Sequence, residues 1–217
     1  METYSTIVRF FQDGGVFMYP IVVVLAVGVT IALERFFYLG RSTSVNRKIW
    51  NQLMPLIKAG NYKKALATTS NSKAAIGKIL NYGLSRSEGA RRRDDIETAM
   101  EEGLMEIMPS LEKRTHYIAT FANIATLLGL LGTIIGLIRA FTAVSHADPA
   151  EKADLLSASI SVAMNTTAFG LMVAIPLLLV YSLLQSKTTT LVDSLEMASV
   201  KFLNMITEQK KTGGSAS

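Results

Sequence analysis

The sequence predicts an all-α integral membrane protein with three transmembrane helices and long cytoplasmic helical extensions. Three hydrophobic stretches carry this prediction: residues 16–39, 116–142 and 155–185. Each is long enough, as a helix, to cross a bilayer core of about 30 Å. The segment between the first two, residues 40–115, is instead rich in lysine and arginine. The 217 residues include no cysteine, which excludes a disulfide framework and a thiolate metal site.

The second hydrophobic stretch has two sides of different size. It carries no charged residue from Tyr117 to Ile138. Small residues line one face at helical spacing: Ala122, Thr126, Gly129, Thr133, Gly136 and Ala140. Leucine and isoleucine occupy the remainder. Because small side chains let neighbouring backbones approach closely within a membrane, we expect the small face to contact protein and the bulky face to contact lipid.

The third stretch repeats this two-sided pattern. Its small residues are Ser159, Ala163, Thr166, Thr167, Gly170 and Ala174. Asn165 adds an amide within the membrane, and Pro176 is expected to bend the helix because it removes one intrahelical hydrogen bond. A slightly acidic hairpin, residues 143–154, precedes this span and is expected outside. Residues 186–217 are predicted to form a cytoplasmic helix to about Gln209 and then a flexible tail from residue 213.

The beginning of the chain does not resemble a cleavable signal, because acidic residues precede its apolar segment. We predict an amphipathic interfacial helix over residues 1–15. The first span, 16–39, contains Glu34 and Arg35 near its far end. Two interpretations of Glu34 stay open: with Arg35 it forms a snorkelling pair at the interface, or it belongs to a cytoplasmic ion exit or a partner contact.

The basic segment 40–115 is predicted to be cytoplasmic by the positive-inside rule, which places the N-terminus outside. Its glycine, asparagine and serine pairs separate the expected short helices: 44–59, 61–70 and 73–87. A longer helix is expected from near Ala90 toward the second span, kinked at Pro109. The arginine run 91–93 has no aromatic interleaving, so attraction to anionic lipid or to the acidic helix is favoured over nucleic acid.

No enzyme signature is present: we find no phosphate-cradling loop, no nucleophile with a base and no paired acids. The two histidines, His116 and His146, lack ligand partners at metal spacing, and no cofactor is expected. The second and third spans contain hydroxyls and amides but no carboxylate. A threonine cannot carry a proton by titrating. If the chain forms an ion path, the titrating acid must therefore come from another polypeptide.

Two motifs in this order resemble the ExbB/TolQ/MotA ion-driven motor family, a family of proton channels. They are TLLGLLGTIIGL, beginning at Thr126, and AMNTTAFGLMVAIPLLLVY, beginning at Ala163. The resemblance extends over nearly the whole chain. Three spans, rather than the four of the flagellar branch, favour the ExbB/TolQ branch.

The resemblance implies a homo-oligomer, a pentamer, that surrounds single-span ExbD/TolR-like partners carrying an intramembrane aspartate. In that picture the ring uses ion flow to energise TonB or TolA in a bacterial inner membrane, with the N-terminus periplasmic and the C-terminus cytoplasmic. By motif, Thr133 and Thr167 line the ion route opposite the partner aspartate. The further ion-path candidates are Thr166, Asn165 and Thr126, and the candidate packing or partner face is Ala122, Gly129, Gly136, Ala163 and Gly170.

One departure from the family pattern concerns the ion. Proton-driven members usually carry alanine before the matching threonine, whereas this chain has Asn165-Thr166-Thr167. A double threonine suits Na⁺, but Thr166 has an alternative role in bonding to its own helix. H⁺ is the favoured ion and Na⁺ the alternative. Two other classes stay open, a packing-only structural subunit and a solute transporter, although the spans lack the charges and inverted repeats expected of the latter.

Overall fold

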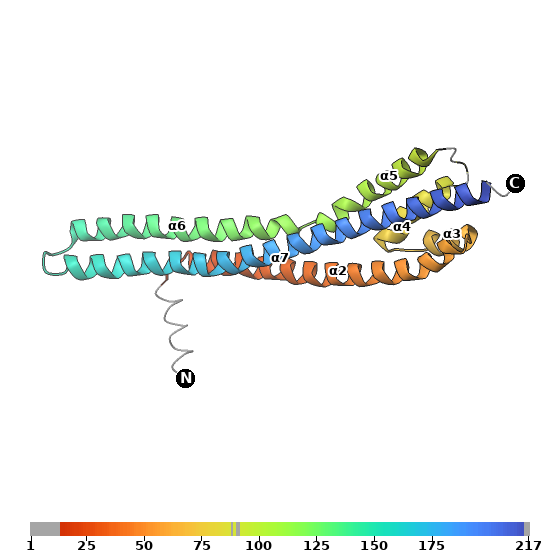
Figure 1. The fold of residues 1–217 in the computed structure, drawn as a ribbon. Helices are drawn as coiled ribbons and strands as arrows, with labels where there is room; N and C mark the ends of the chain where they lie inside the picture. Colours follow the sequence, from red (N-terminus) through yellow and green to blue (C-terminus); the bar gives the residue numbers. More distant parts are fainter. Residues whose placement is uncertain (1–13, 88, 90–91, 215–217) are drawn as a thin grey trace, which may run out of the picture. The chain divides into compact units, whose positions relative to one another are not determined.

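The computed structural model describes residues 14–87, 89 and 92–214, with side chains described to residue 209. These residues are almost entirely helical and contain no strand (Figure 1). In chain order the helices are α2 (Met18–Lys58), α3 (Tyr62–Ser70), α4 (Ala75–Ser87), α5 (Arg93–Glu112), α6 (Thr115–His146) and α7 (Lys152–Gly214). Three helical segments, in α2, α6 and α7, are long and apolar enough to cross a membrane. The predicted fold class is confirmed.

Some of the predicted elements fall outside these residues. The interfacial helix expected over 1–15 lies there except for its last two positions, which are not helical. The helix start expected near Ala90 also lies outside, and the described helix α5 begins at Arg93. The expected tail begins at residue 213, but α7 continues to Gly214, and residues 215–217 are not described.

The first span and the helix expected over 44–59 form one continuous helix, α2. The first span is predicted to end at residue 39 and the next helix to begin at residue 44, so a break was expected between them. In the structure, the Thr43 hydroxyl donates to the Leu39 carbonyl at 2.9 Å and the Ser44 hydroxyl to the Gly40 carbonyl at 3.1 Å. Because these hydroxyls bond to carbonyls of their own helix, they do not compete for the backbone amides, and the helix continues. Helix α7 likewise has no break: it continues through Pro176 and joins the third span to the C-terminal helix.

The chain divides into two compact units. One contains residues 14–34 and 114–184, and so holds most of the hydrophobic spans. The other contains residues 35–113 and the chain from 185 onward, which is the basic helical domain with the last part of α7.

Several polar side chains close the helix ends of the helical domain. The Asn46 carboxamide oxygen of α2 accepts from the backbone N–H of Ile76, in the first turn of α4, at 3.1 Å. Gln209 of α7 donates to the carbonyls of Ile57 and Lys58 at 3.1 and 3.0 Å, at the end of α2. These contacts satisfy backbone groups that a helix end leaves without an intrahelical partner. The domain is therefore tied together at its ends as well as through its apolar core.

Helices α4 and α5 are linked at their surface by a hydrogen bond from the Tyr82 hydroxyl to a Glu106 carboxylate oxygen, at 2.6 Å. This bond, together with the negative charge of Glu106, raises the pKa of Tyr82 above its ordinary value. The bond to the neutral phenol opposes loss of the proton. Tyr82 therefore stays a neutral donor at physiological pH.

The helix that contains Pro109 was expected to continue toward the second span, but it ends three residues after this proline. Helix α5 ends at Glu112, and α6 begins at Thr115. Between them Arg114 adopts a left-handed backbone conformation with φ 66°, which continues neither helix. Arg35, which is 2 % exposed, donates to the Leu111 carbonyl in the last turn of α5 and lies 4.7 Å from the Tyr38 ring centre. A cation at a helix C-terminus is favourable because the last carbonyls carry partial negative charge.

Candidate ion-path site

Helices α6 and α7 lie side by side in the spanning unit (Figure 1) because small residues face each other between them. A Cβ added to Gly129 would lie 3.2 Å from the Thr167 Cα and 3.4 Å from the Gly170 Cα. One added to Gly136 would lie 2.8 Å from the Ala163 Cβ. This close backbone approach is the packing expected of small residues in a membrane. These residues therefore pack the hairpin of a single chain.

Two threonine hydroxyls meet at the edge of this contact. The hydroxyl oxygens of Thr133 on α6 and Thr167 on α7 are in hydrogen-bond contact. Each also crosses to the other helix: Thr167 donates to the Gly129 carbonyl at 2.9 Å, and Thr133 approaches the Ala163 carbonyl at 3.3 Å. Both side chains are only half-buried. The two residues assigned to the ion route by motif are thus brought together in space.

The chemistry of this threonine pair follows from its bonding capacity. A hydroxyl has one hydrogen to donate and two lone pairs that accept. Thr133 and Thr167 together have two hydroxyl hydrogens, which they donate to each other or to the nearby carbonyls. Their four lone pairs accept at most one hydrogen bond within the pair, so lone pairs remain for an outside donor. Because both side chains are partly exposed, a donor from another chain is able to reach them. The pair can accept from a protonated carboxyl group or from water.

Thr166 lies in a different environment from its neighbour Thr167. It is 2 % exposed, and its hydroxyl bonds to the Gly14 carbonyl at 2.6 Å and the Val162 carbonyl at 3.0 Å. A Cβ added to Gly132 of α6 would lie 2.4 Å from the Thr166 methyl carbon. Thr166 therefore joins α6, α7 and the segment that precedes α2. The hydrogen bond to Val162 lies within α7, as expected if Thr166 bonds to its own helix. The hydrogen bond to Gly14 is in addition a tertiary contact.

The other candidate residues are spread around the hairpin. Ala122 is fully buried. Thr126, expected on the same small face, is exposed and donates to the Ala122 carbonyl of its own helix at 3.2 Å. Asn165 is half-buried on α7. Within the single chain, the buried face of α6 therefore includes Ala125, and Thr126 lies outside it.

Glu34 forms an ion pair with Arg114, with 3.1 Å between the carboxylate oxygen and the guanidinium nitrogen. Both side chains are nearly half exposed, at 43 % and 49 %. The predicted pairing of Glu34 with its neighbour Arg35 is therefore wrong, because successive residues of a helix project in directions about 100° apart. Arg114 connects α5 to α6, so Glu34 holds the beginning of α6.

Residues that the sequence argument missed are Gly14, Ala125 and Gly132. Ala125 and Gly132 are both buried on α6. Their spacing of seven residues continues the small face, and this signal was present in the sequence. No sequence pattern predicts the contact of Gly14, because its backbone carbonyl accepts a hydrogen bond from Thr166, which is 152 residues away in the chain.

Bulky side chains cover the outside of both helices, as the size pattern predicted. Leu127, Leu131, Ile134 and Ile138 of α6 are between 42 % and 62 % exposed. No carboxylate occurs anywhere in α6, nor between Asp154 and Asp193 of α7. Within the described residues, no group of three or more potential metal ligands is present. The hydroxyl pair therefore has no acid of its own chain along the second and third spans.

Comparison with known proteins identifies this architecture. A family model described as the MotA/TolQ/ExbB proton channel family matches residues 71–197, more than half of the chain. The chain belongs to this family. The matched residues include all of α6 and the spanning part of α7, and therefore the threonine pair.

Individual relatives support the ExbB/TolQ branch of the MotA/TolQ/ExbB family. A protein of Methanothermobacter thermautotrophicus, named as a biopolymer transport protein ExbB homologue, is 31 % identical over 196 residues, which cover 89 % of this chain and 68 % of the relative. An ExbB-like protein of Synechocystis is 28 % identical over 84 % of this chain and 72 % of its own length. The Tol-Pal system protein TolQ of Haemophilus influenzae is 33 % identical over 43 % of this chain and 40 % of its own. The resemblance seen in the motifs is confirmed.

Proposed function

We propose that this family member is an ExbB-like subunit of an ion-driven motor in a bacterial inner membrane. Five copies form a ring around single-span ExbD/TolR-like partners that carry an intramembrane aspartate. Ion flow past that aspartate energises a TonB- or Tol-type system, and the chain itself has no enzymatic activity. The N-terminus is periplasmic and the C-terminus cytoplasmic, because the lysines and arginines of the helical domain favour the cytoplasmic side.

The observation that carries this proposal is the contact between the Thr133 and Thr167 hydroxyls in spans without a carboxylate. Two adjacent hydroxyls with free lone pairs are suited to receive a neutral carboxylic acid, which donates one hydrogen bond. They are less able to hold the ionised form, since a carboxylate only accepts. A partner aspartate would therefore be bound more favourably when protonated, and would need another environment to release its proton.

We favour H⁺ as the ion. A Na⁺ site would draw on extra oxygen ligands such as the hydroxyl of Thr166. That hydroxyl is buried against the Gly14 and Val162 carbonyls, which supports a structural role. Na⁺ coupling is the second candidate within the same family, because the Asn165-Thr166-Thr167 sequence supplies the donor types.

The proposal is tested by replacing the hydroxyls one at a time in cells or proteoliposomes that also contain the partner subunit. We expect Thr133→Val and Thr167→Val to keep normal expression and assembly, because the exchange nearly preserves shape, and to lower ion flux strongly. Thr126→Val is the matched control, since Thr126 is exposed on the same helix and bonds to its own turn. Flux is measured separately with a pH dye and with a Na⁺ dye.

The outcomes distinguish the alternatives. If both valine variants retain full flux with the partner present, the ion-path role is refuted and the packing-only subunit takes its place. If flux follows the Na⁺ gradient and not the pH gradient, the coupling ion is Na⁺. Native mass measurement of the complex tests the pentamer, which a stable monomer in mild detergent would refute.

A further inference from the structure

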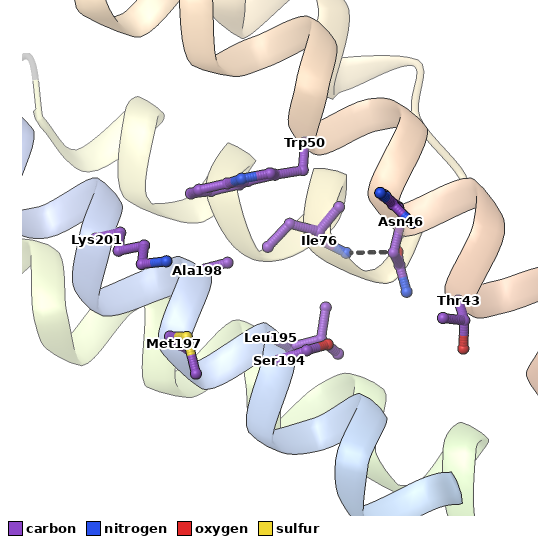
Figure 2. A pocket seen from close by; sticks show the side chains of 10 residues that line it. Thr43, Asn46, Trp50, Ile76, Ser194, Leu195, Met197, Ala198 and Lys201 are labelled. Carbon is purple, nitrogen blue, oxygen red and sulfur yellow. Dashed lines mark hydrogen bonds between the residues drawn. The ribbon is translucent and has the colours of Figure 1, made fainter.

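A cavity in the helical domain has the lining of a small-molecule site. It has a volume of about 290 Å³ and lies between α2 and α7, with α4 contributing one residue (Figure 2). Helix α2 contributes Thr43, Asn46, Arg47 and Trp50, and α7 contributes Ser194, Leu195, Met197, Ala198 and Lys201. The four α2 positions repeat at i, i+3, i+4 and i+7, and so do the α7 positions apart from Leu195, which places them on one face of each helix.

The base of this cavity is held in place by the surrounding structure. Ile76 of α4 is 2 % exposed, and its backbone N–H donates to the Asn46 side chain at 3.1 Å (Figure 2). Asn46 and Leu195 are also buried, at 6 % and 1 % exposed. The apolar floor is therefore fixed by packing and by a hydrogen bond. Ligand sites are usually preformed in this way.

The charge of the lining has one sign. Arg47 and Lys201 are the charged residues among the ten that line the cavity, and both are cations. Among the described residues, neither has an ion-pair partner. Cations gathered around an apolar cavity raise the local concentration of anions. An arginine guanidinium also presents paired donors that match phosphate oxygens.

The Trp50 indole gives the cavity an apolar wall. Its ring extends from α2 toward Ala198 and Lys201 of α7 (Figure 2). Together with Ile76 and Leu195 it offers a surface for a hydrocarbon group, next to the cations that would hold a charged head. We propose that this cavity binds a small amphiphilic phosphate ester, with the phosphate on Arg47 and Lys201 and the apolar tail against Trp50.

Trp50 is the single tryptophan of the chain, so its fluorescence reports on this cavity without labelling. The full-length protein in phosphatidylcholine nanodiscs is titrated with octyl phosphate below its micelle concentration. Octyltrimethylammonium is the charge-reversed probe with the same tail. We expect a saturable change in Trp50 emission with octyl phosphate and none with the cation. An equal response to both probes would show simple apolar partition and overturn the proposal.

Variants test the assigned contacts. We expect Arg47→Gln and Lys201→Gln each to weaken octyl phosphate binding several-fold, and Ala198→Leu to abolish it by filling the cavity. Lys64→Gln removes an exposed lysine outside the cavity and should leave binding unchanged. Wild-type affinity in both cation variants would refute the site. A circular dichroism spectrum equal to that of the wild type is required of each variant, so that misfolding is excluded as the cause of weaker binding.

Nanodiscs that contain phosphatidylglycerol distinguish a membrane lipid from a soluble phosphate ester as the natural ligand. If they change Trp50 emission before any probe is added and block octyl phosphate, the ligand is a membrane lipid. If emission matches that in phosphatidylcholine and octyl phosphate still binds, the ligand is a soluble phosphate ester. The assay needs no partner subunit and no ion flux, so its outcome is independent of the proposed motor function.

Discussion

Gly129 and Gly170 face each other where α6 and α7 pack together. A Cβ added to Gly170 would lie 3.1 Å from the Gly129 Cα and 2.7 Å from the Ala125 carbonyl oxygen. The obstacle at Ala125 is backbone and not the end of a flexible side chain, so neither helix can yield without moving as a whole. This contact fixes the positions from which Thr133 and Thr167 reach each other.

The first prediction is that Gly170→Ala destabilises the protein by about 1–3 kcal/mol, the usual cost of overpacking. The control is Gly40→Ala, because Gly40 lies within α2 and an added Cβ meets nothing within 4 Å. There alanine should stabilise the helix by about 0.5–1 kcal/mol through its higher helix propensity. Unfolding midpoints in a denaturing detergent compare the two. Equal midpoints would contradict the packing described here.

The second prediction concerns Thr166. Thr166→Val leaves the buried Gly14 carbonyl without its 2.6 Å hydrogen bond and should lower stability by about 1–3 kcal/mol. Thr166→Ser keeps the hydroxyl and should lose much less. Neither variant should alter the ratio of H⁺ to Na⁺ flux. A valine variant of normal stability with changed ion preference would instead place Thr166 in the ion path.

The third prediction concerns Arg35, whose buried guanidinium bonds to the Leu111 carbonyl. Arg35→Met keeps much of the length but removes the charge and the donors. Because hydrogen bonds to charged groups contribute about 1.5–3 kcal/mol, we expect the end of α5 to open more readily. Hydrogen exchange of residues 107–114 measures this opening. Lys48→Gln, an exposed change on the same helix, should leave exchange unaltered, and equal exchange in both variants would count against the cap.

The fourth prediction concerns topology. The chain has no cysteine, so a single introduced thiol reports its own accessibility. Ser145→Cys should react with a membrane-impermeant thiol reagent added to the periplasmic side, and Ser70→Cys should not. Both serines are exposed. Ser72, in the loop after α3, is half-buried, so a thiol there would escape labelling because of its burial and not because of its side of the membrane. The reverse pattern would overturn the orientation.

The sequence by itself was sufficient for the all-α membrane fold, for the family and for the residues of the threonine pair. The physical reason is that a bilayer demands long uncharged helices, and close helix contact within it demands small residues at helical spacing. Both demands act on residues near one another in the chain. Gly129, Ala163 and Gly170 could therefore be selected from the size pattern, whereas Thr133 and Thr167 were selected through the resemblance of their motifs to the family.

Only the tertiary structure decided which partner each of these groups meets. Thr166 and Thr167 have the same side-chain chemistry, but the fold places one hydroxyl on the Gly14 carbonyl and the other on Thr133. Likewise Glu34 pairs with Arg114 while its neighbour Arg35 bonds to Leu111. Adjacent residues of a helix point about 100° apart, so their partners come from distant segments. Helical periodicity specifies the angle between two side chains, and only packing specifies what lies at the end of each.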